Sequence, residues 1–485
     1  MENQNKILIE KYQQENEKSY QFLSRGVEIL KTLLSRNFES YIIGSCVRNF
    51  YINQPIDLIE IVTYAKVDEI KKIYPSLIID QRGIGYLKDN NGYFYFSHFE
   101  DDVNISKKYE GKHYNKKLVS VLQNKYFTID SLVITPTFQI TDVLGGEDDL
   151  KNMLIKPIDK PKSLFNTAPI AILEALELVA LYDFDIDKKT LKIMAKSCAH
   201  LEDIKDVHFI KRLRKIIKGK YGKKASNLIV DYKLFRFVHI FDLYIKKINR
   251  KFDSYTFLEK LSILYLLFAS IPDAESIDPK ELNELTENLT ISQLVASNPI
   301  TPMMVYNIGA DKLTSANKIA MVYKHNYSSQ ARRINKLKKK AIINNIRELN
   351  ISNLEIIKLL DGERSIKVKI IINMLLEKVI NGEIINHNTI LKDETKKLSN
   401  EIDEIFNYQE PGILIEYDED SIKDLKDKYE KELAFLVKVY LSDEKELYNL
   451  TALEREEAFD NAKKHAKEFL LETSQYKVLE KRGLI

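Results

Sequence analysis

The sequence predicts an α+β protein, with a small mixed β-sheet in the N-terminal third and an all-helical region over the rest of the chain. Short apolar runs, and segments that alternate between apolar and polar residues, dominate residues 1–150. From Pro169 onward apolar residues recur at spacings of three and four, and Gly and Pro become scarce. At 485 residues the chain is too long for one compact core, so we expect several domains.

The first elements alternate between helix and strand. Residues 5–36 have helical periodicity, and residues 40–52 (SYIIGSCVRNFYI) predict a short strand, a Gly-Ser turn and a helix. Residues 56–65 (IDLIEIVTYA) predict a second strand, and a helix follows at residues 67–75 (VDEIKKIYP). This order of elements is typical of a compact mixed domain and not of a helical bundle.

Two hairpins are predicted next. Residues 84–99 alternate around an Asn-Asn-Gly turn, and residues 127–143 turn near Pro136. Pro169 suits the first position of a helix. Residues 408–414 (YQEPGIL) are the best late boundary, and the segments after Glu416 predict charged amphipathic helices.

Composition sets limits on partners and compartment. The net charge is only +3, from 74 basic and 71 acidic residues, so any contact with nucleic acid must come from local basic patches. The two cysteines, Cys46 and Cys198, cannot form a disulfide framework, which favours a reducing, cytoplasmic location. We expect no membrane contact, because the N-terminus lacks the apolar core of a signal peptide and no run of about 18 apolar residues is present.

Five short segments, in this order and at this spacing, resemble one known family. They are Gly44–Asn49 (GSCVRN), Pro55–Thr63 (PIDLIEIVT), Lys125–Asp130 (KYFTID), Asp142–Leu150 (DVLGGEDDL) and Thr167–Ala175 (TAPIAILEA). The chain is similar over roughly residues 20–395 to the class II tRNA nucleotidyltransferases (CCA-adding enzymes) and poly(A) polymerases of bacteria. Residues 351–362 and 375–391, with Asn381-Gly382-Glu383 at a turn, resemble the final helices of that family.

The resemblance implies a nucleotidyltransferase head followed by a helical neck, body and tail. The expected segments are residues 1–36 (N-terminal helical segment), 37–165 (head), 166–260 (neck and RNA-binding region), 261–400 (body and tail) and 401–485 (an extra C-terminal helical extension).

The family performs nucleotidyl transfer with two metal ions, held by carboxylates two residues apart on one strand. The matching positions here are Leu58 and Glu60, and leucine cannot ligate a metal. Asp57 is three residues from Glu60, so only a β-bulge would bring the two carboxylates together. A further carboxylate of the family corresponds to Tyr95. We therefore expect no intact catalytic residue and no bound metal, and a solvated or capped Glu60 is the simpler interpretation.

The nucleotide site that the resemblance implies is altered in the same way. Its remnants are Gly44, Ser45, Arg48 and Thr63, of which Gly44 would alternatively serve only a tight turn and Arg48 only a structural ion pair. The family's base-selecting Asp and Arg correspond to Ala168 and Ala171, and two further arginines of the same helix correspond to Glu174 and Glu177. Two carboxylates facing a triphosphate would repel it. Gly145-Gly146 and Asp142 are expected to form a turn with its local cap.

Two basic stretches are candidate RNA contacts, because cations gather there in an otherwise neutral chain. The alternative interpretation is that these stretches are solvated helix faces. In the first stretch an apolar stripe would pack on the core and leave the cations on the outer face. The residues that we select for phosphate contact are Lys211, Arg212, Arg214, Lys215, Lys218, Arg332, Arg333 and Lys336.

Three functions remain open from the sequence. The main hypothesis is an RNA-binding protein of this family, with tRNA or another structured RNA as partner, no catalytic activity and no cofactor. The first alternative is an active, divergent CCA-adding or poly(A)-adding enzyme that uses ATP or CTP and Mg²⁺. The second is a scaffold that binds a protein partner through residues 401–485.

Overall fold

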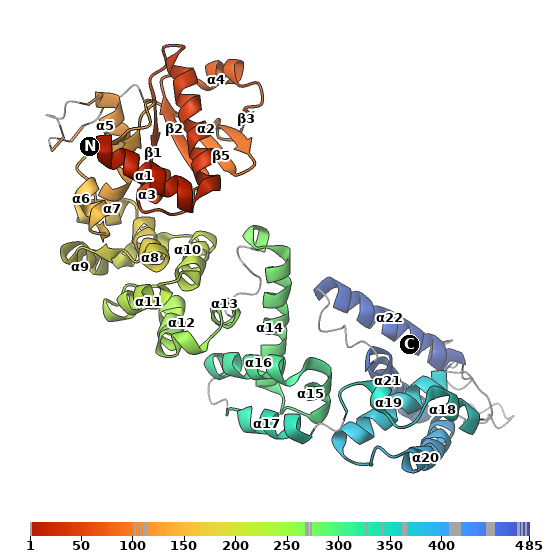
Figure 1. Cartoon of the computed structure of the whole chain (residues 1–485). Coiled ribbons are helices and arrows are strands. Elements are labelled where there is room, and N and C mark those ends of the chain that lie inside the picture. The colour runs from red at the N-terminus through yellow and green to blue at the C-terminus, as the bar shows by residue number, and fades with distance from the viewer. Residues whose placement is uncertain are drawn as a thin grey trace. The chain divides into compact units, whose positions relative to one another are not determined.

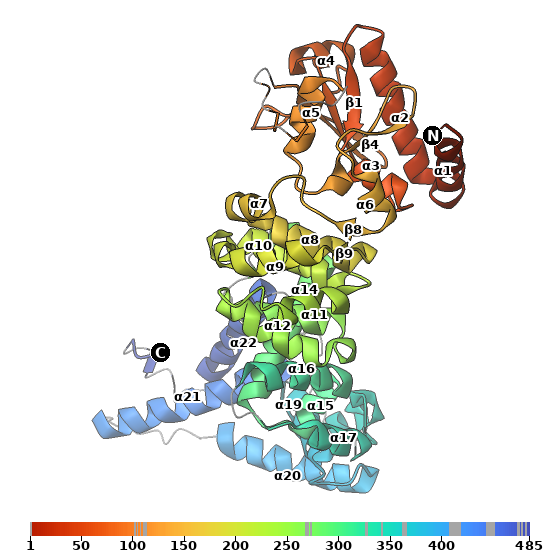
Figure 2. The same cartoon turned by 90° about the vertical axis from the view of Figure 1, so that its left-hand side faces the viewer.

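The computed structural model describes the whole chain except residues 1, 101–102, 104, 107, 110–113, 267–270, 272–273, 325–327, 341–342, 361–365, 407–418, 443–451, 473–475, 477–478 and 481–482. The chain forms two compact units, Met1–Ser254 and Tyr255–Ile485, and each is described by itself (Figure 1, Figure 2). The predicted division into five segments stays a prediction.

A seven-stranded mixed sheet forms the centre of the head. Its spatial order is β3-β4-β5-β2-β1-β6-β7, and only β2 and β5 are parallel, while all other neighbours are antiparallel. The strands are β1 (Ser40–Ile43), β2 (Leu58–Thr63), β3 (Ile78–Ile79), β4 (Gly85–Asp89), β5 (Gly92–His98), β6 (Leu132–Ile134) and β7 (Ile140–Asp142). The predicted mixed-sheet head and both predicted hairpins are confirmed.

The helix α2 (Glu17–Leu34) covers one face of this sheet (Figure 1). Apolar residues recur along α2 at helical spacing, so one stripe is buried. Phe22 contacts Phe94 of β5 with ring centroids 4.5 Å apart. Gly26 lets the helix approach closely, because a Cβ there would meet Ile42 at 3.1 Å and Ile59 at 3.2 Å. A larger residue at this position would push the helix away from β1 and β2.

The opposite face of the sheet is covered over β1 and β6 by α5 (Lys116–Gln123). Leu118, Val119 and Leu122 of this helix pack with Ile43, Val62, Phe99 and Val133 in one buried cluster. The same face is not covered in this way along β4, β5 and the start of β2, where Leu58 and Tyr93 stay exposed. This difference leaves an open surface on the head.

The remaining elements of the first unit are helices and one small strand pair. The helices are α1 (Glu2–Glu15), α3 (Ser45–Tyr51), α4 (Val67–Ile73), α6 (Glu147–Lys151), α7 (Pro161–Thr167), α8 (Ile170–Tyr182), α9 (Lys188–Ser197), α10 (Asp206–Lys218), α11 (Gly222–Asp231) and α12 (His239–Arg250). The strands β8 (Leu154–Ile155) and β9 (Asp185–Ile186) pair in parallel. The helix α8 is buried along most of its length and packs against α10 and α11.

The second unit is helical in its described residues. Its helices are α13 (Phe257–Tyr265), α14 (Pro279–Ser297), α15 (Pro302–Ile308), α16 (Ala310–Tyr323), α17 (Ala331–Lys340), α18 (Asn353–Leu359), α19 (Ile366–Asn381), α20 (Asn388–Phe406), α21 (Glu419–Ser442) and α22 (Ala452–Glu472). The predicted charged helices after Glu416 are confirmed as α21 and α22.

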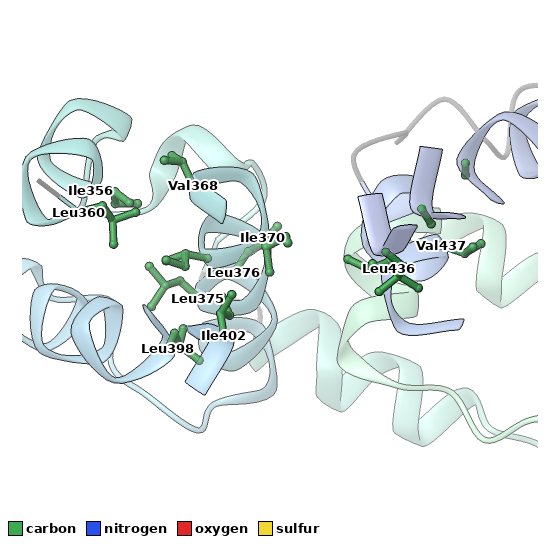
Figure 3. Packing of buried hydrophobic residues seen from close by; sticks show 14 of the residues in the cluster. Ile356, Leu360, Val368, Ile370, Leu375, Leu376, Leu398, Ile402, Leu436 and Val437 are labelled. Carbon is green, nitrogen blue, oxygen red and sulfur yellow. The ribbon is translucent and has the colours of Figure 1, made fainter. Parts of the chain in front are cut away.

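The C-terminal extension shares one apolar cluster with the helices before it. Figure 3 shows side chains such as Leu375, Leu398 and Ile402 between α19 and α20, and Leu436 and Val437 on α21. Tyr476 is fully buried in the same cluster, and its hydroxyl donates to Glu432 of α21. The extension is therefore part of the core of the second unit.

A few predicted boundaries differ from the structure. The helical stretch at residues 5–36 is two helices that meet at Asn16, which donates a 2.7 Å hydrogen bond to the Asn53 side chain. Pro169 lies just before α8, not at its first position. The all-helical prediction after Pro169 is wrong at β9, because Asp185 and Ile186 pair with β8. The predicted boundary at residues 408–414 lies outside the described residues.

Cys46 and Cys198 are both buried and free, as expected. In the described part of the chain no single helix has the length and apolar character to cross a membrane, although the bent pair α7 and α8 passes that test when taken together.

Candidate functional site

The turn after β1 forms the first side of the candidate site. Gly44 has φ +80° and ψ −147°, a conformation that residues with a Cβ rarely adopt. A Cβ at this position would lie 3.2 Å from Oε2 of Glu60 and 3.5 Å from Nζ of Lys125. The glycine turn, Glu60 and Lys125 therefore converge at one point, although they come from three distant segments. Ser45 follows the turn and is exposed.

The strand β2 presents Leu58 and Glu60 on the same side. They are two residues apart, and Leu58 is 41% exposed. Glu60 accepts a hydrogen bond of 2.6 Å from Nζ of Lys125 in a half-buried ion pair. The carboxylate is thus neutralised by an ammonium group, at a position where the resemblance predicts a metal ligand. Glu60 is therefore neither merely solvated nor capped, as the sequence suggested, but has Lys125 as a specific partner.

The side chains at this point can be compared with the ligands that Mg²⁺ requires. Magnesium takes oxygen ligands and needs carboxylates free to face it. At this point of the head the donor is one carboxylate, already paired with an ammonium whose charge repels a cation. Within the described residues no group of three or more His, Cys, Asp and Glu is arranged to hold a metal ion. The residues present do not fit the two-metal centre of the family.

Asp57 does not join Glu60 through a bulge. The pairing of β2 with β5 advances one residue at a time on both strands, from Leu58 opposite Tyr93 to Thr63 opposite His98. The pairing with β1 is equally regular at Ile43 opposite Glu60. The carbonyl of Asp57 accepts 3.1 Å from the amide of Tyr93, and Gly92 comes so close that a Cβ there would lie 1.9 Å from that oxygen. The backbone of Asp57 is therefore held in line with the strand.

Arg48 turns inward, away from solvent. Its Nη1 lies 2.6 Å from Oδ1 of Asp130, and both side chains are less than a tenth exposed. Its other nitrogens donate to Asn49, and the guanidinium lies 5.7 Å from the ring centroid of Tyr182. Arg48 is thus in a buried ion pair, which is the structural alternative raised from the sequence.

The other remnants of the nucleotide site also have local partners. Thr63 is fully buried, and its hydroxyl accepts a hydrogen bond from the amide of Ala65. Asp142 accepts from the amides of Gly145, Gly146 and Glu147, so it caps the turn before α6 as expected. Tyr95 of β5 lies directly opposite Glu60, and Ala168 is the residue that follows α7.

The acidic face expected on α8 does not stand open to a ligand. Glu177 accepts 2.6 Å from Arg212 and 2.8 Å from Lys215, and Glu174 accepts 3.1 Å from Arg212. Both basic partners come from α10. The prediction that these carboxylates would face and repel a triphosphate is wrong, because α10 neutralises them. Ala171, on the same helix, is fully buried.

Replacing Glu177 with glutamine is expected to destabilise the first unit by about 2 kcal/mol. The change leaves Arg212 and Lys215 without the carboxylate that binds both of them. Chemical denaturation followed by circular dichroism measures the loss. An unchanged free energy of unfolding would show that this pairing contributes little.

The same substitution at Glu174, on the same helix, should have the opposite effect. Burial raises the pKa of the Glu174 carboxyl above 4.5, and nearby Asp130 acts in the same direction. The stability that this group contributes is present below pH 4.5 and is lost as pH rises through its folded-state pKa. In Glu174→Gln the side chain cannot ionise, so this loss of stability with rising pH does not occur. The variant should therefore gain stability relative to the wild type as pH rises above 4.5.

Three of the candidate RNA contacts, Arg212, Lys215 and Arg333, already have a partner within the protein, and two of these three are still exposed. Arg212 and Lys215 bind α8, and Arg333 donates from Nε to the carbonyl of Ile300. A cavity of about 290 Å³ lies beside α10, lined by Ile170, His208, Lys211, Arg212 and Lys215. The selected residues whose side chains are exposed are Lys211, Lys215, Lys218, Arg332, Arg333 and Lys336, and Arg214 is partly buried.

This architecture defines a class of fold: a head built on a seven-stranded mixed sheet, followed in the chain by a helical region. Residues 40–156 match the family model of the Poly A polymerase head domain. Over these residues the chain is similar to poly(A) polymerase heads, and the curated proteins that it resembles along most of its length are CCA-adding enzymes.

Relatives and solved structures agree over most of the chain. A CCA-adding enzyme of Geobacillus sp. (strain WCH70) is 23% identical over 386 residues, which are 75% of this chain and 94% of that protein. The CCA-adding enzyme of Bacillus stearothermophilus in complex with CTP has a TM-score of 0.53 and 16% identity, over 78% of this chain and 98% of that one. The Thermotoga maritima CCA-adding enzyme complexed with tRNA has a TM-score of 0.52 and 16% identity, over 78% and 96%.

Two partners in the site were missed from the sequence. Lys125 and Asp130 are the two ends of the segment KYFTID, and the sequence assigns no partner to either of them. Lys125 lies 65 residues from Glu60, and Asp130 lies 82 residues from Arg48. No local pattern signals such pairs, although the opposite charges at motif positions were a usable hint.

Proposed function

We propose that this chain is a tRNA-binding protein of the CCA-adding family whose head does not catalyse nucleotidyl transfer. The observation that carries the proposal is the β2 geometry, in which one metal position is the exposed Leu58 and the other is Glu60 paired with Lys125. Two-metal transfer needs carboxylates that clamp both ions and neutralise the developing charge. A leucine and an ammonium-bound glutamate supply neither.

Binding to tRNA is supported by the fold and by exposed basic residues. The chain shares its fold with the Thermotoga maritima enzyme that is complexed with tRNA. Lys211 on α10 and Arg332 and Lys336 on α17 are exposed cations in a nearly neutral chain. Such contacts bind the phosphate backbone and depend strongly on salt.

The wild-type protein is expected to shift tRNA in a gel at low salt and to leave a tRNA without its 3′ end unextended. The assay contains ATP, CTP and Mg²⁺ with a labelled tRNA. The Geobacillus enzyme serves as positive control. Glu60→Gln is the matched variant, and we expect it to bind tRNA as the wild type does.

The results separate the parts of the proposal. If no tRNA binds even at low salt, RNA binding is excluded. If the wild type extends tRNA and Glu60→Gln does not, the head catalyses nucleotidyl transfer, and the proposal that it lacks this activity is excluded.

An active, divergent nucleotidyltransferase is the second candidate, and the comparisons favour it. The similar proteins reported above are CCA-adding enzymes, and the match extends over three quarters of the chain. Gly44 also keeps a tight turn at the start of α3, with φ +80°. This candidate requires Lys125 to release Glu60 and a carboxylate from elsewhere to join it on Mg²⁺. Extension that depends on Mg²⁺ and on Glu60 would establish it.

A further inference from the structure

Three tyrosines gather on the face of the head sheet that α2 does not cover. Tyr93 and Tyr95 are two residues apart on β5 and so point to the same side, and Tyr86 of β4 lies directly opposite Tyr95. The rings of Tyr86 and Tyr95 are stacked with centroids 5.5 Å apart. Tyr93 lies 6.0 Å from Tyr86 and 6.2 Å from Tyr95. We call these three residues the tyrosine face.

The tyrosine face continues into neighbouring strands. Leu58 of β2 and Lys88 of β4 both lie opposite Tyr93 in the strand register, so they share its side of the sheet. Tyr93 is 39% exposed, Leu58 is 41% exposed, and Lys88 is exposed too. The result is an accessible aromatic surface with an ammonium group beside its most exposed ring.

The charge at the end of the tyrosine face is cancelled. Glu60 lies opposite Tyr95 and would repel a phosphate, but its ion pair with Lys125 neutralises it. A polyanion can therefore approach this surface. Aromatic rings with a nearby cation suit a planar, uncharged group attached to a phosphate, which is the chemistry of an unpaired nucleotide in RNA.

We propose that the tyrosine face binds unpaired nucleobases of an RNA by stacking, with Tyr93 as the principal ring and Lys88 contacting the adjoining phosphate. The inference rests on the proposed RNA binding. It adds that the head binds the unpaired nucleotides of that RNA. Stacking needs no metal ion and no triphosphate. It tolerates any base, because every base has a π-face.

The test compares two RNA hairpins with the same stem, one blunt and one with an unpaired 3′ tail that contains a fluorescent adenine analogue. The wild type should bind the tailed RNA about ten-fold more tightly, and the analogue should be quenched on binding. Tyr93→Ala should remove both the preference and the quenching. Affinity for the blunt hairpin, and the salt dependence of its binding, should stay unchanged, because the blunt RNA has no unpaired base to stack on Tyr93.

Two variants control for trivial effects. Tyr93→Phe keeps the ring and should keep the preference. Tyr114→Ala removes a tyrosine of similar exposure, 38%, outside the tyrosine face and should change nothing. Thermal unfolding checks that every variant is folded.

The outcomes are distinguishable from failure of the proposed function. If the wild type binds both hairpins equally, or if Tyr93→Ala keeps the preference, the tyrosine face does not bind bases, while RNA binding stands. If neither hairpin nor tRNA binds, the proposed RNA binding fails and this inference fails with it.

Discussion

Arg48→Met is expected to destabilise the first unit by about 3 kcal/mol. The guanidinium is 7% exposed and Asp130 is 8% exposed, with 2.6 Å between Nη1 and Oδ1. Removing the arginine leaves a carboxylate buried in the head without its counter-ion, and that cost exceeds the loss of one surface contact. Urea denaturation followed by circular dichroism measures the change in the free energy of unfolding.

The reciprocal variant tests whether the effect belongs to the ion pair. Asp130→Asn should be destabilising as well, and the double variant should cost less than the sum of the two single changes, because both remove the same interaction. Lys31→Met is a suitable control, since its pair with Glu28 is on the exposed surface of α2. A stable Arg48→Met protein that had lost a nucleotide-dependent activity would instead assign Arg48 to a ligand and support the catalytic candidate.

Changing Arg332, Lys336 and Lys339 together to alanine is expected to weaken tRNA binding by roughly 100-fold at about 0.1 M salt. At helical spacing the three side chains lie on one face of α17, and all are exposed, while Ile334 on the other side is buried. Each lost phosphate contact should lower the slope of log K against log salt by about one. Filter binding over a range of salt concentrations gives both quantities.

Lys338 is the matched control on the same helix. It points away from that face and lies 3.0 Å from Asp311 of α16. Lys338→Ala should therefore leave affinity and slope nearly unchanged. If the triple variant also kept the wild-type slope, α17 would be a solvated face, and RNA contact would have to come from α10 or elsewhere.

Local patterns were sufficient for most of the fold. The alternation in residues 84–99 with Asn-Asn-Gly at the turn predicts the β4–β5 hairpin, because strand periodicity and turn chemistry depend on neighbouring residues alone. Spacings of three and four likewise predict the helices of the second unit. The short β9 was missed, since its pairing with β8 depends on a partner about 30 residues away, from Ile155 to Ile186.

The sequence by itself determined that a leucine lies two residues before Glu60, at a position where the resemblance predicts a metal ligand, and that a mixed-sheet region precedes a helical one. The tertiary structure alone decided that Glu60 meets Lys125, that Arg48 meets Asp130, and that α10 neutralises Glu174 and Glu177. It also decided that Tyr86 joins Tyr93 and Tyr95 on an open face. The physical reason is that periodicity specifies the face on which a side chain lies, whereas its partner depends on which distant segments pack together.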